Sequence, residues 1–215
     1  MPMKTKASEP GLQRRCPGLF GLLVVALLAH PSVVRGISFS LDPADQSVEL
    51  GTPVSINVRI SGLGSGSAPS LGAFDFNLGF DPAVLAFTSI SFGDPVLGDQ
   101  LGPLLGSITG SSVDAVTGSV NQFGVSLDLP SDLNALQADT FVLTSLTFSS
   151  VGVGATPLII SDLVLGDAEG APLSAQIING SARVTKTVVV PEVGSTAVLM
   201  IAGFAAISAM RRGRV

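Results

Sequence analysis

Residues 73–85 read AFDFNLGFDPAVL, and the alternation within this stretch predicts the fold class. Apolar residues occupy every second position from 74 to 80, while Asp75 and Asn77 take positions between them. Residues 54–60 (VSINVRI) repeat the same period of two. Successive side chains of a strand point to opposite sides, so this alternation indicates strands with one buried and one solvated face. The two stretches therefore predict a β-sheet that is covered on one side only.

The same pattern extends over the region between residues 37 and 187. Turn residues separate the candidate strands, which number roughly nine at intervals of about 8–15 residues. Beyond the two stretches above, the candidates are 37–41, 47–50, 84–91, 118–122, 125–127, 140–149, 156–165 and 175–184. We predict an all-β fold, an antiparallel β-sandwich of the jelly-roll type, with the nine Phe residues of this region in its core.

Three local features are predicted within this sandwich. Residues 131–138 form a short helix, with Ser131 or Asp132 as its N-cap. The Gly- and Ser-rich stretches 62–70 and 102–113 form long loops between strands. Asn179-Gly180 forms a hairpin turn, because this dipeptide readily adopts the positive φ angles that tight hairpins need.

Composition excludes several functional classes for the central region. Residues 37–190 contain three basic and fourteen acidic residues, a net charge of −11. Such a region has no basic patch to neutralise phosphates, which argues against nucleic-acid binding. It also lacks Cys and His, since Cys16 and His30 both precede it. Thiol and Ser-His-Asp catalysis, zinc fingers and haem ligation are therefore excluded.

Carboxylates leave two further chemistries to consider. Paired carboxylates can hydrolyse glycosides, but the chain has no Trp and no Tyr to stack on a sugar, so we predict no enzymatic activity. Calcium is a weaker possibility that stays open. Asp162, Asp167 and Glu169 are expected to crowd one turn, and Ca²⁺ binds six to eight oxygens. No EF-hand loop accompanies them, and a polar turn without metal is the alternative. No other cofactor is predicted.

Residues 1–36 have the three parts of a secretory signal peptide. Basic residues precede an apolar run at 18–29, and small residues follow it. The run is too short to span a hydrocarbon core that needs about 20 residues. We expect export and cleavage near Gly36. An uncut N-terminal anchor and a twin-arginine export signal at Arg14-Arg15 are the alternatives.

Residues 188–215 form a second signal of three parts. Pro191 and Glu192 precede an apolar stretch at 194–210, and a basic cluster closes the chain: Arg211, Arg212 and Arg214. This order resembles the PEP-CTERM sorting signal of Gram-negative bacteria, except that Val193 replaces its second proline. The resemblance implies an exosortase-type processing enzyme as a partner. It also implies a transmembrane helix in the inner membrane before processing, and display at the cell surface or in the extracellular matrix. An ordinary C-terminal anchor is the alternative.

Three motifs in residues 37–185 resemble cohesin domains. Residues 73–85 resemble the third-strand signature, in which an aromatic-Asp-Pro-x-x-Leu motif follows an alternating strand. Residues 48–54 resemble the first hairpin, and residues 165–184 resemble the C-terminal hairpin. The resemblance implies a non-catalytic receptor for dockerin modules, of the kind found in polysaccharide-degrading systems. It also implies that Asp75 contacts the partner, with Asn77 beside it on the same face.

The predicted organisation is a signal peptide (1–36), a cohesin-like β-sandwich (37–187) and a sorting segment (188–215). The predicted function is a secreted, surface-displayed binding or scaffold module that recognises a dockerin-like protein through Asp75 and Asn77. A carbohydrate-binding module for extracellular polysaccharide and a structural matrix protein are the alternatives. Asp75 and Asn77 could also do no more than keep a strand face soluble.

Overall fold

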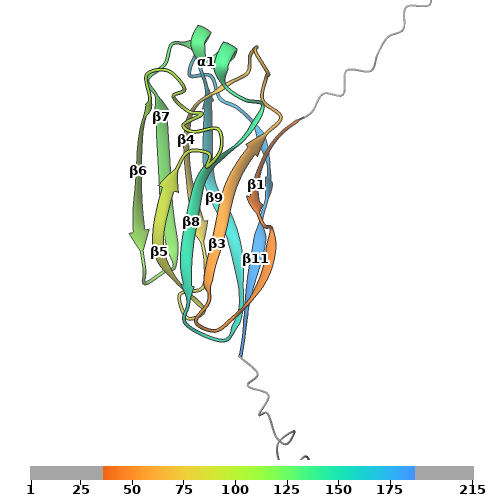
Figure 1. The fold of residues 1–215 in the computed structure, drawn as a ribbon, viewed down its shortest axis with the longest axis vertical. Coiled ribbons are helices and arrows are strands. Elements are labelled where there is room, and N and C mark those ends of the chain that lie inside the picture. The colour runs from red at the N-terminus through yellow and green to blue at the C-terminus, as the bar shows by residue number, and fades with distance from the viewer. Residues whose placement is uncertain (1–35, 187–215) are drawn as a thin grey trace, which may run out of the picture. The chain divides into compact units, whose positions relative to one another are not determined.

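The computed structural model describes residues 36–186, which form two β-sheets packed face to face (Figure 1). One short helix, α1 (Pro130–Leu136), accompanies eleven strands. The strands in chain order are β1 (Ile37–Asp42), β2 (Asp45–Glu49), β3 (Pro53–Ser61), β4 (Leu71–Gly79), β5 (Leu85–Phe92), β6 (Ser107–Asp114), β7 (Ser119–Ser126), β8 (Thr140–Ser150), β9 (Gly154–Asp167), β10 (Ala175–Ile178) and β11 (Gly180–Thr185). The predicted two-sheet β-sandwich is confirmed, with more strands than the nine expected.

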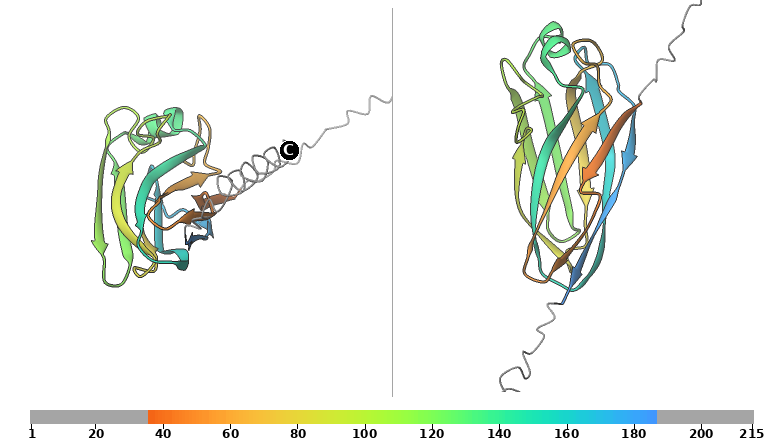
Figure 2. Two further views of the ribbon diagram at one scale, coloured as in Figure 1. Left: turned by 60° about the horizontal axis from the view of Figure 1, so that its bottom comes forward. Right: turned by 45° about the vertical axis from the view of Figure 1, so that its right-hand side comes forward.

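The strand order defines the two sheets. One sheet has the order β10-β1-β3-β8-β5, and the other has the order β2-β11-β9-β4-β7-β6. The chain changes sheets between β1 and β2, and again between β10 and β11. These first and last segments run side by side, so β1 pairs with β10 and β2 pairs with β11 in parallel (Figure 2). All other pairs are antiparallel, which corrects the expectation of a wholly antiparallel sandwich.

Asn179-Gly180 is the second of these sheet changes and not a hairpin turn. The Asn179 Oδ1 atom accepts a hydrogen bond from the backbone N–H of Ile160 at 2.9 Å. A Cβ atom on Gly180 would overlap the carbonyl oxygen of Ala44, so only glycine allows this close approach of the chain. The prediction of a turn was wrong because both residues contact segments that are distant in the sequence, Asn179 at Ile160 and Gly180 at Ala44.

The core lies between the two sheets and contains six of the nine Phe residues of this region. Phe39 packs edge-on against Phe76 with ring centroids 4.9 Å apart, and Phe80 packs likewise against Phe148 at 5.0 Å. Among the described residues, the core extends from Phe39 to Val184, so the first and last strands both contribute to it.

Strand β7 departs from the predicted core. Val120, Gln122 and Gly124 face inward, so Phe123 and Val125 face solvent with 41% and 49% of their surface exposed. The expectations that Phe123 lies in the core and that Val125 lies on a buried face were therefore wrong. The sequence 119–126 contains polar and apolar residues on both sides, so alternation alone does not determine which side is buried.

Two further local predictions need correction. The N-cap of α1 is Leu129, without a side-chain hydrogen bond, and Pro130 begins the helix, because the fixed φ of proline suits the first turn. Residues 102–113 were expected to form a loop, but residues 107–114 form β6 and pair with β7 along their whole length. Pairing with β7 satisfies the backbone N–H and C=O groups of these residues. A Gly- and Ser-rich composition does not reveal such pairing. The predicted loop at 62–70 is confirmed between β3 and β4.

The predicted terminal signals lie outside the described residues. These are the signal peptide and the sorting motif with Pro191, Glu192, Arg211, Arg212 and Arg214. Within residues 36–186, no helix is long and apolar enough to cross a membrane.

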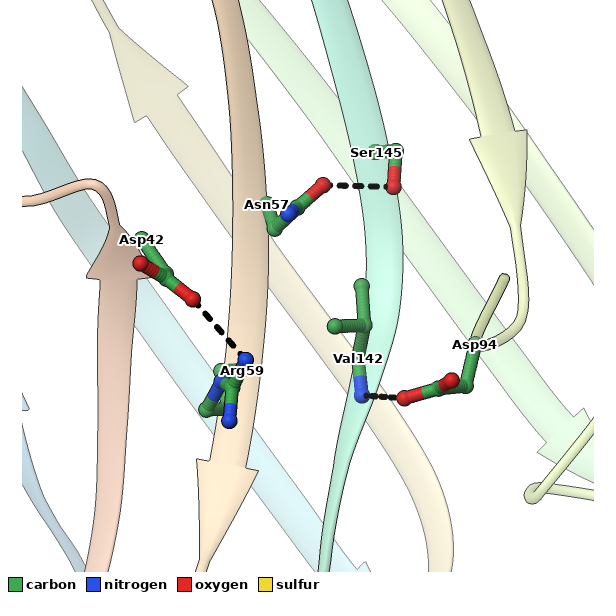
Figure 3. Close-up of polar contacts among 6 residues, drawn as sticks. All are labelled: Asp42, Asn57, Arg59, Asp94, Val142 and Ser145. Atoms are coloured by element: carbon green, nitrogen blue, oxygen red, sulfur yellow. Dashed lines mark hydrogen bonds and ion pairs between the residues drawn. The ribbon is translucent and has the colours of Figure 1, made fainter. Parts of the chain in front are cut away.

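Asp94 connects two strands through its carboxylate. Its Oδ1 atom accepts the backbone N–H groups of Val96 and Leu97, and its Oδ2 atom accepts that of Val142 at 2.8 Å (Figure 3). Burial by itself raises the pKa of Asp94. The three N–H donors and the nearby Arg59 outweigh this effect, so the pKa lies below its ordinary value. The carboxylate therefore stabilises the fold above pH about 4, and this contribution is lost as the pH falls through the lower folded-state pKa.

We predict that Asp94→Ala lowers the free energy of unfolding by about 1–3 kcal/mol at pH 7, because the Val142 N–H loses its acceptor. The difference from the wild type should shrink as the pH falls through the lowered pKa of Asp94, because the wild-type carboxylate then becomes protonated. Urea unfolding followed by circular dichroism over a series of acidic pH values and at pH 7 measures this, since the chain has no Trp or Tyr for fluorescence. A difference that stays constant with pH contradicts the assignment.

We also predict that Phe76→Ala lowers the free energy of unfolding by about 3–5 kcal/mol, because it leaves a cavity in the core. Phe123→Ala is the matched control and should change this free energy by less than about 1 kcal/mol, since the ring is on the surface. Equal effects of the two substitutions on the urea midpoint would contradict the inward and outward assignments of these rings.

Candidate functional site

Asp75 and Asn77 lie where the alternation of β4 predicted them. Phe74, Phe76 and Leu78 point into the core, so Asp75 and Asn77 point outward from the six-stranded sheet. β4 lies between β7 and β9. Residues that lie directly opposite each other on adjacent strands share a face. The register of β4 therefore determines which side chains surround these two residues.

A hydrogen-bonded network joins Asp75 and Asn77 across three strands. The Asn121 Nδ2 atom of β7 donates to Asp75 Oδ1 at 2.8 Å and also lies 3.1 Å from Asn77 Oδ1. The Asn77 Nδ2 atom donates to Asp162 Oδ2 of β9 at 2.8 Å. Two amides thus hold two carboxylates in fixed positions on the outer face, and each carboxylate keeps acceptor capacity toward solvent.

An irregularity of β9 brings Asp162 into this network. The register between β4 and β9 shifts between Asp75 and Asn77, and Asp162 has a φ of +53°. The extra residue of such a β-bulge turns consecutive side chains to the same side, and here Ser161 and Asp162 are both exposed. Aspartate tolerates this left-handed conformation better than most residues. Neither Asn121 nor Asp162 was predicted as a partner contact, because their position depends on register and on this bulge.

The structure separates the three calcium candidates. Asp162 lies on the sheet face, whereas Asp167 ends β9 and closes its own turn by accepting the backbone N–H groups of Glu169 and Ala171. The three residues therefore do not occupy a single turn. Among residues 36–186, no group of three or more His, Cys, Asp or Glu side chains is placed to hold a metal ion.

Apolar side chains surround Asp75 on the same outer face. Phe123 lies directly opposite Asp75 on β7, and Val164 lies opposite it on β9. Val125 and Ile108 continue the row toward the edge of the sheet. The exposed fractions are 65% for Val164, 58% for Ile108, 49% for Val125 and 41% for Phe123. A shallow depression of about 550 Å³ is lined by several of these side chains together with Asp75. We call Asp75, Asn77, Ile108, Asn121, Phe123, Val125, Asp162 and Val164 the outer-face patch.

The charged side chains of the outer-face patch, Asp75 and Asp162, are both acidic. Strands β4, β6 and β9 contain aspartates, β7 contains no charged residue, and none of the four strands contains Lys or Arg. The basic residues of the described chain are Arg59, Arg183 and Lys186, and none of them lies on these four strands. A partner that contacts Asp75 or Asp162 therefore has to supply the hydrogen-bond donors itself.

The outer face of the other sheet is different (Figure 3). Arg59 pairs with Asp42 at 2.8 Å, and the Ser145 hydroxyl donates to Asn57 at 2.7 Å. Strands β1, β3, β5 and β8 present no large apolar side chain that is exposed, and the exposed Ile177 and Ile178 of this sheet lie on its short edge strand β10. Among the described residues, the row of exposed apolar side chains beside carboxylates therefore lies on the six-stranded sheet.

Comparison with known proteins identifies the fold. No protein-family model matches the chain, and no curated protein is recognisably similar in sequence. Solved structures do match it. A non-cellulosomal cohesin from the hyperthermophilic archaeon Archaeoglobus fulgidus has 16% identity and a TM-score of 0.52, over 71% of this chain and 94% of that one. The chain has a cohesin-like fold.

Two further cohesins support this assignment. A type II cohesin domain from the cellulosome of Acetivibrio cellulolyticus matches with a TM-score of 0.54 and 16% identity, over 68% of this chain and 95% of that one. A cohesin from a type I cohesin–dockerin complex of Clostridium thermocellum matches with a TM-score of 0.55 and 11% identity, over 70% and 99%. At these identities, the likeness establishes the cohesin-like fold, and the partner has to be argued from the outer-face patch.

Proposed function

We propose that this protein is a non-catalytic recognition module that binds a partner protein through the outer-face patch. The observation that carries the proposal is the row of half-exposed apolar side chains beside Asp75, on one face of the sandwich. Soluble monomers rarely expose large contiguous apolar surfaces, and those that do usually bind something there. The cohesins in several of the matched structures are in complex with dockerins, which supports a dockerin-like protein as the partner.

The patch combines two physical contributions to binding. Covering the apolar row contributes about 25 cal/mol for each Å² removed from water. Asp75 and Asp162 accept hydrogen bonds from the partner, and Asn121 and Asn77 hold them in place beforehand. Fixing side chains before binding reduces the conformational entropy that binding has to overcome. Phe123 lies beside Asp75 near the middle of the patch, the position where large aromatic side chains contribute most.

The proposal includes the route by which the module reaches its partner. Residues 1–36 direct export, and residues 188–215 direct sorting by an exosortase-type enzyme that recognises Pro191, Glu192 and the terminal arginines. The module is then displayed at the cell surface or in the extracellular matrix, in a system that makes or degrades polysaccharide. Its acidity keeps such a domain soluble.

Binding to extracellular polysaccharide is the second candidate, and Phe123 is the observation that favours it. Its ring is 41% exposed and lies directly opposite Asp75. An exposed ring beside a hydrogen-bond acceptor can hold a sugar, because the ring covers the apolar side of the sugar and the acceptor binds a hydroxyl. The same patch therefore serves either ligand class, and a binding experiment has to include both.

We predict that residues 36–186, immobilised on a sensor, retain a protein from the host's extracellular fraction. Phe123→Ala and Asp75→Ala should each weaken this binding by about tenfold or more, as expected for central interface residues. Asn57→Ala on the opposite face is the matched control and should leave binding unchanged. The fraction is applied with calcium and with chelator, because a dockerin-like partner folds around calcium.

The control ligand is the purified exopolysaccharide of the host. Retention of polysaccharide alone, with loss in Phe123→Ala, would replace the protein partner by the second candidate. Protein binding that weakens equally in Asn57→Ala and Phe123→Ala would contradict the proposed face.

A further inference from the structure

Strand β6 forms an open edge of the six-stranded sheet. All eight of its residues pair with β7 without a shift in register. β6 is the outermost strand in Figure 1, and no strand of residues 36–186 pairs with its other side. Half of its backbone N–H and C=O groups therefore point away from the sheet. Such an edge is a template for a further strand unless charge, proline, a bulge or shortness protects it.

The other three edges have that protection. β10 is only four residues long. β2 is five residues long and carries Asp45 and Glu49. β5 has a register shift against β8 between Phe87 and Ser89, which interrupts a regular edge. β6 has none of these features, since it contains no Pro, no Lys and no Arg, and its single charge, Asp114, lies at its end.

The scarcity of charge on β6 allows a second copy of the chain to approach along this strand. The described region has a net charge of −11, so a second copy is repelled from most other directions. Apart from Asp114 at its end, β6 forms an uncharged edge of the sheet together with the neighbouring outward residues of β7, Phe123 and Val125. The Phe123 ring also covers Gly110, where a Cβ atom would come within 2.5 Å of the ring. This apolar ring therefore reaches the edge strand itself.

We propose that β6 pairs with β6 of a second copy, antiparallel about a two-fold axis through Ser111. In this register Ser111 lies opposite Ser111, Gly110 opposite Ser112, and Thr109 opposite Val113. Asp114 lies opposite Ile108, so the two copies bring no like charges together. Residues an even number apart share a face, so the two six-stranded sheets join with their outer faces on the same side.

The paired copies keep their outer-face patches accessible, because β6 contributes its backbone edge and Asp75 lies two strands away on β4. The four strand pairs between β6 and β11 are all antiparallel, so these two strands run in the same direction. Antiparallel β6 pairing therefore points the ends of β11 at Thr185 in opposite directions. This last step rests on the proposed surface display. With each copy displayed at a surface, such a pair connects two opposing surfaces.

Edge pairing of this size gives a weak dimer. Stable interfaces bury about 1,200–2,000 Å² in total, and a contact made by one eight-residue strand from each copy is small by that standard. We therefore expect a monomer–dimer equilibrium that depends on concentration, with a Kd between about 1 μM and 1 mM.

Sedimentation velocity of residues 36–186, from about 1 μM to 1 mM, tests the proposal. The variants Ser111→Pro and Ser112→Pro are compared. Neighbouring N–H groups of an antiparallel strand point alternately to β7 and to the open edge, so one variant removes a hydrogen bond to β7 and the other removes a donor of the open edge. The variant whose N–H faces the edge should keep the wild-type Tm and remain monomeric. Asp75→Ala should still dimerise, which separates this proposal from the proposed function.

A cysteine cross-link tests the register. Residues 36–186 contain no Cys, so Ser111→Cys introduces a single thiol, which should form a disulfide between copies on oxidation. Ser89→Cys on the exposed edge strand β5 is the matched control and should cross-link far less. A wild type that is monomeric at 1 mM overturns the proposal. So does a dimer that persists in the Pro variant of unchanged Tm, or one that cross-links equally at Ser89.

Discussion

The pairing of β4 with β7 on one side and β9 on the other is the constraint on which both the core and the candidate site depend. The inward side chains of β4 contribute three aromatic rings to the core when Phe80, just after the strand, is included with Phe74 and Phe76. Its outward side chains place Asp75 and Asn77 on the surface. A shift of one residue in this register would bury the two polar groups and expose the rings. The packing of the β4 rings in the core therefore also fixes Asp75 and Asn77 on the outer face.

The two neighbours of β4 contribute to the site in different ways. β7 is regular, and its pairing places Phe123 and Asn121 directly opposite Asp75 and Asn77. β9 is irregular, and its bulge turns Asp162 toward Asn77. The regular strand thus supplies an apolar ring and an amide, whereas the bulge supplies the second carboxylate. The result is a polar network with an apolar row beside it, and the proposed binding face rests on this arrangement.

The two outer faces of the sandwich differ in the side chains that they present to solvent. On the five-stranded sheet, Arg59 pairs with Asp42, and Asn57 bonds to Ser145. These groups satisfy one another and leave little for a partner. On the six-stranded sheet, two carboxylates held by amides lie beside half-exposed apolar side chains, and its last strand has an open edge. This sheet therefore carries both the proposed binding face, which uses side chains, and the proposed pairing edge, which uses backbone groups.

The sequence by itself determined the class of fold, the outward position of Asp75 and Asn77, and the absence of Cys, His and basic clusters from the domain. These properties follow from strict alternation in β4 and from composition, which are local. Only the tertiary structure decided that Phe123 is outside, that β6 is a strand and that Asn121 and Asp162 join Asp75 and Asn77. In β7 both sides contain polar and apolar residues, in β6 few residues are apolar, and the bulge of β9 leaves no mark on the sequence. Each of these outcomes depends on which strand lies beside which and in what register, and that choice is made by burying the core as a whole.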